Sequence, residues 1–357
     1  RRERLPFLTG RLNPRRGSAD AMGMSPALAT TAAAAAAPPT AAPLVSVVLI
    51  TCNRAGMLAR CLRTLFAQTW RPLEILVVDD GSTDATPDEL ARLGATAGDV
   101  PFTVLRHAQN RGIGAARNTG IAAARGEWIA FTDDDCEAAP DWLAELTRTG
   151  LAHPDAAIVG GAIDEPPRPT WAQRASEGLN HLGNADAEVR AVVGCNMAFR
   201  AAFLRAHPFD EGARNYADEL DRCLVARRQG HRIRFTPAAR VVHHHRHTIA
   251  SFLRQQWRRG AGSVWVRARH RAGLWPRKNY VVAGLVASPL AFAVVPPAAA
   301  TGFAAACAAA FLAQTVALDR RRGKSWRSTL ATLPLVLAGY LAEFGGAAHA
   351  LVRGRRQ

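Results

Sequence analysis

β-Branched apolar runs that alternate with amphipathic stretches constrain the fold of this chain most strongly. The runs occupy residues 44–51 ("LVSVVLIT"), 73–80, 102–107, 127–135 and 156–163. Such runs are typical of strands buried on both faces. Apolar residues at helical spacing fill the intervals 57–69, 86–94, 113–124 and 141–153. This alternation predicts an α/β fold, with a mostly parallel, Rossmann-like sheet and helices on both faces.

Two further segments extend the pattern beyond residue 190. Residues 192–200 ("VVGCNMAFR") predict another strand. Residues 216–235 predict a helix, because its acidic start and basic end both suit the helix dipole. The segment "RVVHHHRHT" follows at 240–248.

Polar clusters stand where three of the predicted strands end. They are "TCNR" at 51–54, "DDGSTD" at 79–84 and "TDDD" at 132–135. Ligands of parallel sheets bind at the carboxyl ends of the strands, so we expect these clusters to form one site.

Three adjacent carboxylates, Asp133, Asp134 and Asp135, end the fourth strand. Adjacent like charges near an apolar interior are unfavourable unless something compensates them. Alternate residues of a strand share a direction, so Asp133 and Asp135 would converge as an Asp-x-Asp motif. Mg²⁺ takes carboxylates together with substrate phosphates, and it would neutralise a leaving diphosphate. The triplet therefore predicts a divalent cation, Mg²⁺ or Mn²⁺.

The turn at Asp79 and Asp80 has the chemistry of a nucleoside site, since carboxylates accept hydrogen bonds from a base or a ribose. No G-x-G-x-x-G follows the first strand, which disfavours a Rossmann dehydrogenase. "TCNRAGM" is also a poor phosphate loop for a nucleotidyltransferase.

Two polar clusters near residue 220 and residue 245 each allow two interpretations. The acidic residues at this helix start could interact favourably with the helix dipole, or one of them could supply a general base. They are Asp218, Glu219 and Asp221. The histidines at 243, 244, 245 and 247 could form a solvated turn or contact a metal or phosphate.

Charge and cysteine usage indicate the partners and the compartment. The net charge of +16 favours an anionic partner. Arginines flank apolar runs near the C-terminus, which predicts membrane lipids and not nucleic acid. Six scattered cysteines without a CxxC pair predict reduced thiols in a cytoplasmic compartment.

The C-terminal third predicts membrane association. Residues 251–271 resemble an interfacial basic amphipathic helix. Residues 281–318 carry no charge and predict two short spans that turn at Pro296–Pro297, with both basic flanks on the cytoplasmic side. The run 329–352 could be re-entrant, interfacial or spanning, and buried soluble helices are the alternative for all of these runs.

These observations divide the chain into four parts. Residues 1–43 form a basic, Ala/Pro-rich tail that we expect to be disordered. An α/β domain (44–250), an amphipathic helix (251–278) and hydrophobic segments (279–357) follow. No signal-peptide pattern is visible at the start, and Met22 or Met24 is a candidate first residue.

Several motifs in order resemble family 2 glycosyltransferases of the GT-A fold over about residues 44–250. They are "VSVVLITCNRAGMLARCLRTLFAQTWRPLEILVVDDGSTDAT", "NRGIGAARNTGIAAARGEWIAFTDDDC", "GCNMAFR" and "ADELDRCLVARRQGHRI". The resemblance implies a nucleotide-sugar donor and a single displacement with inversion at the anomeric carbon.

The resemblance also implies roles for individual residues. The donor would be bound by Thr51, Asn53, Arg54, Asp79, Asp80, Arg117, Asn118, Asp133 and Asp134. The metal would be held by Asp133 and Asp135, with Asp135 as a direct ligand, and one of His243 and His245 would add a ligand or a diphosphate contact.

This chain departs from the family pattern at two motifs. The usual Glu-Asp pair is replaced by Asp218–Glu219, so Glu219 occupies the base position by alignment and Asp218 is the alternative. "QQWRRG" differs from the Gln-x-x-Arg-Trp motif of processive members. We therefore expect a transferase of single sugars.

Together these features predict a metal-assisted, inverting glycosyltransferase at the cytoplasmic face of the inner membrane. Its acceptor would be a hydroxyl of a lipid-linked or membrane-proximal glycan, as in cell-envelope polysaccharide biosynthesis. A non-catalytic, membrane-anchored nucleotide-sugar-binding protein is the alternative, followed by a nucleotidyltransferase.

Overall fold

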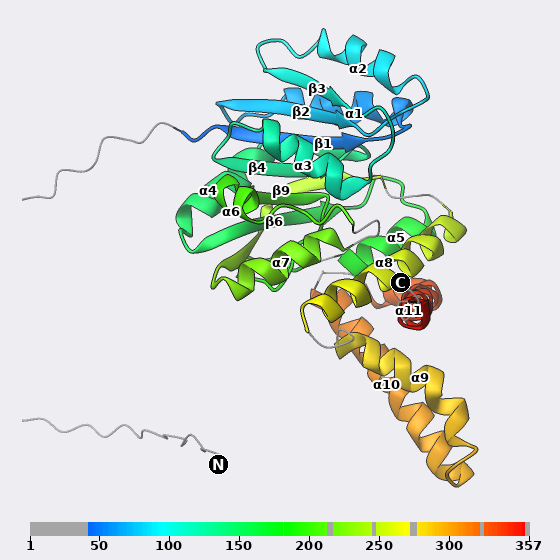
Figure 1. The fold of residues 1–357 in the computed structure, drawn as a ribbon. Helices are drawn as coiled ribbons and strands as arrows, with labels where there is room; N and C mark the ends of the chain where they lie inside the picture. Colours follow the sequence, from blue (N-terminus) through cyan, green and yellow to red (C-terminus); the bar gives the residue numbers. More distant parts are fainter. Residues whose placement is uncertain are drawn as a thin grey trace, which may run out of the picture. The chain divides into compact units, whose positions relative to one another are not determined.

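The computed structural model describes residues 42–180, 182–212, 217–244, 248–271, 277–321 and 325–353. In this part of the chain a nine-stranded sheet has the order β3-β2-β1-β4-β8-β6-β9-β5, and β7 pairs with β9 (Figure 1). The strands are β1 (Val45–Thr51), β2 (Leu73–Asp79), β3 (Phe102–Arg106), β4 (Trp128–Asp133), β5 (Cys136–Ala138), β6 (Ala156–Asp164), β7 (Ala187–Glu188), β8 (Asn196–Arg200) and β9 (Arg232–His243).

The predicted parallel sheet is confirmed in the half formed by β1 to β4. Strands β2 and β4 both pair with β1 in parallel, so Thr51 lies opposite Asp79 and Ile50 lies opposite Asp133. This register brings the polar strand ends to one edge of the sheet. Strand β8 is antiparallel to both β4 and β6, and β9 is parallel to β6.

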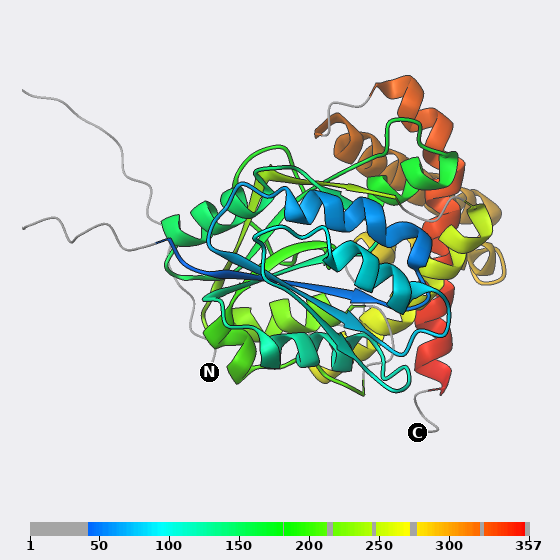
Figure 2. The same cartoon turned by 90° about the horizontal axis from the view of Figure 1, so that it is seen from above.

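Helices cover both faces of the sheet, as predicted (Figures 1 and 2). One buried cluster joins the sheet to α1 (Ala55–Phe66), α2 (Thr86–Gly94) and α4 (Trp142–Ala152). A second cluster joins the other face to α3 (Ile113–Ala123), α6 (Ala201–Ala206) and α7 (Asp218–Arg228). Strands β1, β2, β4 and β6 are buried on both faces, which explains their continuous apolar sequence.

Two predicted elements have wrong bounds. The helix predicted over 216–235 ends at Arg228, and β9 begins at Arg232. Gly230 has a φ of +81° and ends the helical path, and Ile233 and Phe235 then alternate with more exposed arginines, which is the period of a strand. Strand β8 begins at Asn196 instead of residue 192.

The predicted apolar C-terminal helices are present. They are α8 (Ile249–Arg269), α9 (Arg277–Ala291), α10 (Pro297–Arg321) and α11 (Trp326–Arg353), with α5 (Trp171–Asn180) packed beside α8 and α11. Helices α9 and α10 form a hairpin whose turn precedes Pro297 (Figure 1). In the described residues, the segments Pro297–Ala317 and Trp326–Val352 are long and apolar enough to span a membrane, each with a mean hydropathy of 1.5.

Glycines allow α8 and α11 to approach with their backbones in contact. A Cβ atom at Gly260 would lie 1.8 Å from the carbonyl oxygen of Glu343, and one at Gly346 would lie 1.9 Å from that of Trp257. No larger side chain fits at either position without separating the helices. This contact fixes α8 closely against α11.

Candidate active site

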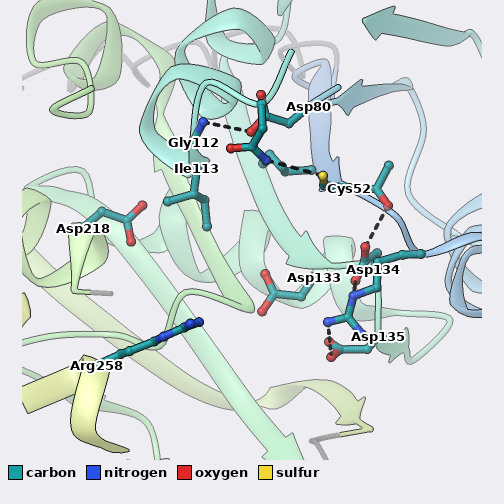
Figure 3. A pocket seen from close by; sticks show the side chains of 13 residues that line it. Cys52, Asp80, Gly112, Ile113, Asp133, Asp134, Asp135, Asp218 and Arg258 are labelled. Atoms are coloured by element: carbon teal, nitrogen blue, oxygen red, sulfur yellow. Dashed lines mark hydrogen bonds and ion pairs between the residues drawn. The ribbon is translucent and has the colours of Figure 1, made fainter. Parts of the chain in front are cut away.

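A cavity of about 390 Å³ opens at the carboxyl ends of β1, β2 and β4 (Figure 3). Its described lining comes from the three strand ends, the start of α3, the start of α7 and α8. The lining residues are Ile50, Thr51, Cys52, Arg54, Asp80, Asn110, Gly112, Ile113, Asp133, Asp134, Asp135, Asp218 and Arg258. The three polar clusters therefore meet at one site, as the sequence predicts.

Asp80 shapes the loop that leads into α3. Its two carboxylate oxygens accept hydrogen bonds from the backbone amides of Arg111 and Gly112, each at 2.9 Å, and Oδ1 lies 2.7 Å from Nδ1 of His107. Gly81 has a φ of +75°, and a Cβ there would lie 2.5 Å from the backbone of Asn110. Asp80 thus lines the cavity and also holds its wall in place.

Asp79 and Asn53 lie behind the cavity and connect its loops. Asp79 Oδ1 accepts a hydrogen bond from the backbone amide of Ser82 at 2.9 Å, and Oδ2 lies 3.3 Å from Arg106 Nε. Asn53 Oδ1 accepts from the amide of Thr83 at 2.8 Å. Neither residue is among the described lining of the cavity.

The acidic triplet divides into one carboxylate held by the first strand and two that face a histidine. Thr51 Oγ1 donates to Asp134 Oδ2 at 2.8 Å, and Arg54 lies 3.7 Å from the same carboxylate. Strand β4 ends at Asp133, so the predicted extension of this strand to Asp135 is wrong. A turn follows, yet ligand atoms of Asp133, Asp135 and His243 all lie within 4.8 Å of one another.

His243 reaches this group because it ends β9, where it pairs with Cys136 of β5. Its Nε2 atom lies 3.0 Å from Asp135 Oδ1. The other predicted histidine, His245, lies outside the described residues. The histidine cluster left a metal or phosphate contact open and the family resemblance implied one for His243 or His245, whereas the pairing of β5 with β9 gives the structural cause for His243.

Arg54 lies 3.6 Å from Asp135 as well as beside Asp134, yet burial raises the pKa of two carboxylates of the triplet. Burial, followed by the nearby Cys195 and Asp135, raises the pKa of Asp133 to about 8. Burial and Asp135 raise the pKa of Asp134 to about 6. Burial alone would lower the pKa of His243, but the neighbouring Cys195 and Asp135 outweigh it and raise this pKa well above its usual value. A divalent cation would relieve the repulsion between Asp133 and Asp135.

The donor atoms fit such a cation. Two carboxylates and one imidazole suit Mn²⁺, and carboxylates with water and phosphate oxygens suit Mg²⁺. Five carboxylates and only two guanidinium groups line the described part of the cavity. An anionic diphosphate would be repelled by that balance unless a cation joined it.

A buried ion pair stands on the other side of the cavity. The guanidinium of Arg117 donates to Asp218 Oδ2, and it packs on Phe131 and Phe209, 5.6 Å and 5.1 Å from their ring centroids. Asn118 holds the same segment, because its side chain exchanges two hydrogen bonds of 2.9 Å with the backbone of Phe209. Arg117 and Asn118 are not among the described lining residues, and they support Asp218 from behind.

Glu219 lies beside this pair. Burial and the charge of Asp218 raise the pKa of Glu219 to about 7. Gly194 leaves room for the group, since a Cβ there would lie 3.3 Å from Arg117 Nη2 and 3.7 Å from Glu219 Oε2. Of the two predicted base candidates, Asp218 lines the cavity, whereas Glu219 is not among its described lining residues.

Sequence reasoning missed Arg258 and Cys195. Figure 3 shows Arg258 reaching from α8 toward the space between Asp218 and Asp133. Its sequence context suggested only a membrane-facing helix. Cys195 Sγ lies 3.6 Å from Nδ1 of His243, and together with Cys136 and His243 it forms a buried cluster of three metal-ligand side chains. All six cysteines are free thiols.

Comparison with known proteins agrees with this geometry. Residues 46–207 match the family model "glycosyl transferase family 2", and residues 128–338 match "glycosyl transferase family group 2". A glucosyl-dolichyl phosphate glucuronosyltransferase of Haloferax volcanii is 31% identical over 222 residues, which cover 56% of this chain and 68% of that protein. A pre-mycofactocin glycosyltransferase of Mycobacterium tuberculosis is 30% identical over 63% of this chain and 48% of its own length.

A solved structure shares the architecture. The mannosyltransferase PcManGT of Pyrobaculum calidifontis, solved with GDP-Man and Mn²⁺, superposes with a TM-score of 0.61 and 26% identity over 88% of this chain and 89% of its own. The predicted family and fold are thereby confirmed. With its GT-A sheet and its acidic site at the strand ends, the chain belongs to the family 2 glycosyltransferases.

Proposed function

We propose that this enzyme transfers one sugar from a nucleotide sugar to a hydroxyl of a lipid-linked or membrane-proximal glycan, with inversion at the anomeric carbon. The observation that carries the proposal is the cavity itself. Asp133 and Asp135, which form a candidate cation site with His243, line this cavity together with Asp218, and Arg258 of α8 supplies part of its wall.

The donor would lie along the strand ends. Asp80 and the loops held by Asn53 and Asp79 form the end suited to the nucleoside, with Thr51, Arg54 and Asp134 beside it. The diphosphate would lie toward Asp133 and Asp135, where Arg258 provides a positive charge. The Pyrobaculum protein, solved with GDP-Man and Mn²⁺, supports a nucleotide sugar and a divalent cation for this chain.

Asp133, Asp135 and His243 would hold the cation, Mn²⁺ or Mg²⁺. When bound, it supplies charge neutralisation for the leaving nucleoside diphosphate. These three groups would be oriented before the donor binds, since Asp133 ends β4, His243 ends β9, and the carbonyl of Asp135, in the turn between β4 and β5, accepts a hydrogen bond from the amide of His244.

Glu219 is our choice for the general base. Oδ2 of Asp218 already accepts a hydrogen bond from the buried guanidinium of Arg117, which favours a supporting role for this carboxylate. A pKa of about 7 for Glu219 suits a base that works near neutral pH. Asp218 and Arg117 would then act as the support that orients this base.

The C-terminal helices support the proposed acceptor and location. Helix α8 reaches the cavity through Arg258 and packs on α11, which is apolar enough to associate with a membrane. The Haloferax relative acts, by its name, on glucosyl-dolichyl phosphate, which supports a lipid-linked acceptor here. We propose that the catalytic domain faces the cytoplasm at the inner membrane.

Donor hydrolysis by the full-length protein in detergent tests the proposal, because water replaces the unknown acceptor. A panel of UDP-, GDP- and dTDP-sugars is incubated with Mn²⁺, with Mg²⁺ or with EDTA, and the released nucleoside diphosphate is measured. We expect release from one donor class, dependent on the cation and lost in Asp135→Ala. Donor binding without release, even when membrane lipid extracts are added as acceptors, would favour the non-catalytic binding protein.

A further inference from the structure

Helix α11 lies crosswise to the α9–α10 hairpin. In Figure 1 α11 is seen end-on, whereas α9 and α10 are seen along their length, and Figure 2 shows α11 along its own length. The middle of α11 meets the base of the hairpin in one buried cluster that contains Val282, Phe311 and Tyr340. The rings of Phe311 and Tyr340 pack edge to face with centroids 5.8 Å apart. A bilayer crossed by the hairpin therefore cannot also be crossed by α11.

The exposed face of α11 is an apolar stripe. Trp326, Leu330, Leu341 and Val352 are exposed by 64%, 49%, 41% and 74%. Their spacings of about four and eleven residues are close to whole turns of a helix, so the four side chains lie on one side. Glu343 is buried at 4% on the side that faces α8. A helix with one apolar side and one buried side suits an interface between two phases.

The packing partner of α11 is too polar for the bilayer core. Helix α8 touches α11 at Gly260 and Trp257 and carries five arginines, at positions 254, 258, 259, 267 and 269. Arg258 lines the catalytic cavity, and Arg269 forms an ion pair with Asp210 of the catalytic domain. A charged side chain at the centre of a bilayer is unfavourable by several kcal/mol. If α11 crossed the bilayer, it would draw α8 and these arginines into the hydrocarbon.

Both ends of α11 carry the signals of a membrane surface. Trp326 begins the helix, and tryptophan concentrates at the level of the lipid headgroups. Basic residues stand at both ends, in "RRRGKSWR" (320–327) and "RGRRQ" (353–357). Both groups would be attracted to anionic headgroups of one leaflet, whereas a spanning helix would place one group on the opposite side.

We propose that α11 lies in the plane of the membrane surface, on the side of the catalytic domain. Its stripe Trp326–Leu330–Leu341–Val352 would enter the boundary between headgroups and acyl chains of an anionic leaflet, and only the α9–α10 hairpin would insert deeply. Of the three interpretations of residues 329–352, this placement agrees with the interfacial one. The inference does not depend on the proposed reaction, because it concerns depth and sidedness alone.

Depth measurements on the full chain in anionic liposomes test this placement. Spin labels are attached to cysteines introduced at Leu330, Leu341 and Val352, in a background that lacks the two incompletely buried thiols (Cys52→Ser, Cys307→Ala). Leu330 and Val352 are about 33 Å apart along a helix, roughly the thickness of the hydrocarbon core. We expect all three labels to report the same shallow depth. A deep label at 341 between two shallow ones would show that α11 spans, and three water-exposed labels would show that it does not touch the membrane.

Two matched labels calibrate the scale. A label at Leu151, exposed by 48% in the catalytic domain, should remain in water. A label at Val294, exposed by 81% at the turn of the hairpin, should differ in depth from the α11 labels.

Sidedness provides an independent test. A protease site is inserted after Arg322 or after Gln357 in the full chain, and sealed inverted membrane vesicles are treated with the protease. We expect both sites to be cleaved alike, on the side of the catalytic domain. Cleavage of the first site only would place the C-terminus across the membrane and overturn the proposal.

Discussion

His243 of β9 lies 3.0 Å from Asp135, from its Nε2 atom to a carboxylate oxygen. The opposite ring nitrogen lies 3.6 Å from the thiol of Cys195. The ring is thus held from both sides, with one nitrogen directed at the candidate cation site. Groups that hold the second nitrogen of a ligating histidine orient the ring and adjust its affinity for the metal. We therefore regard Cys195 as a positioning residue for the cation site.

Replacement of Cys195 should weaken cation binding more than it lowers kcat. Cys195→Ala removes the contact to His243 Nδ1, and we expect a 10- to 100-fold loss of Mn²⁺ affinity by analogy with other supporting residues of metal sites. Cys195→Ser should retain part of the affinity, because a hydroxyl can still accept from the ring. Mn²⁺ binding is measured by electron paramagnetic resonance, and kcat is measured at saturating Mn²⁺. Cys307→Ser on α10 is the control, and an unchanged affinity in Cys195→Ala would refute this role.

Replacement of Asp135 should remove the dependence on cations. In Asp135→Asn one charged ligand is lost while shape is kept, and we expect donor hydrolysis to fall by about 10²–10³-fold, in the range found when transition-state charge stabilisation is removed. Asp141→Asn is the control, because Asp141 is exposed just before α4 and its side chain makes no capping hydrogen bond. Full activity of Asp135→Asn in EDTA would argue against a cation at this site.

Asp218 and Glu219, at the start of α7, should have different roles. Glu219→Gln should lower kcat by about 10²–10⁴-fold with the acceptor present, the usual contribution of a general base, while donor binding is kept. Asp218→Asn should mainly lower the free energy of unfolding, by about 3–5 kcal/mol, because Arg117 would be buried without its partner. Thermal unfolding and donor titrations distinguish these outcomes. A stable Asp218→Asn enzyme with low kcat would exchange the two assignments.

Stability without cations should fall as pH rises from 6 to 8. The pKa of Asp133 is about 8 in the folded protein against 3.8 ordinarily, so between these values the folded state keeps a proton that the unfolded chain has lost. The unfolded state then binds fewer protons, and the free energy of unfolding decreases with pH. Saturating Mn²⁺ should reduce this decrease, since it favours the charged carboxylate. Melting temperatures at pH 6 and pH 8, with and without Mn²⁺, test this, and Asp133→Asn should weaken the pH dependence.

Sequence alone predicted the parts of the site that depend on local chain order. The apolar runs that end at Asp80 and at Asp133 specify parallel strands, and parallel strands bring their ends to one edge. It could not place Arg258, because its position depends on how α8 docks on α11 through Gly260. Sequence analysis also missed Cys195, because the contact between its thiol and His243 forms only when segments far apart in the chain come together in the sheet. The start of β9 was missed because the helical charge pattern of 216–235 masked the turn at Gly230.

The close contact of α8 with α11 should be required for donor binding. A side chain at Gly260 would meet the carbonyl of Glu343 at 1.8 Å, so Gly260→Val must push the helices apart and move Arg258, two residues earlier in α8, away from the cavity. Arg258→Ala removes the same guanidinium without disturbing the packing. We therefore expect both variants to raise the dissociation constant for the nucleotide sugar by a similar factor, about tenfold or more if one charge-assisted hydrogen bond to the diphosphate is lost. Gly302→Ala is the matched control, because a Cβ at this position on α10 meets no atom within 4 Å. Donor binding measured by calorimetry should be normal in the control. Normal binding in Gly260→Val together with weak binding in Arg258→Ala would show that the helix contact does not set the position of the arginine.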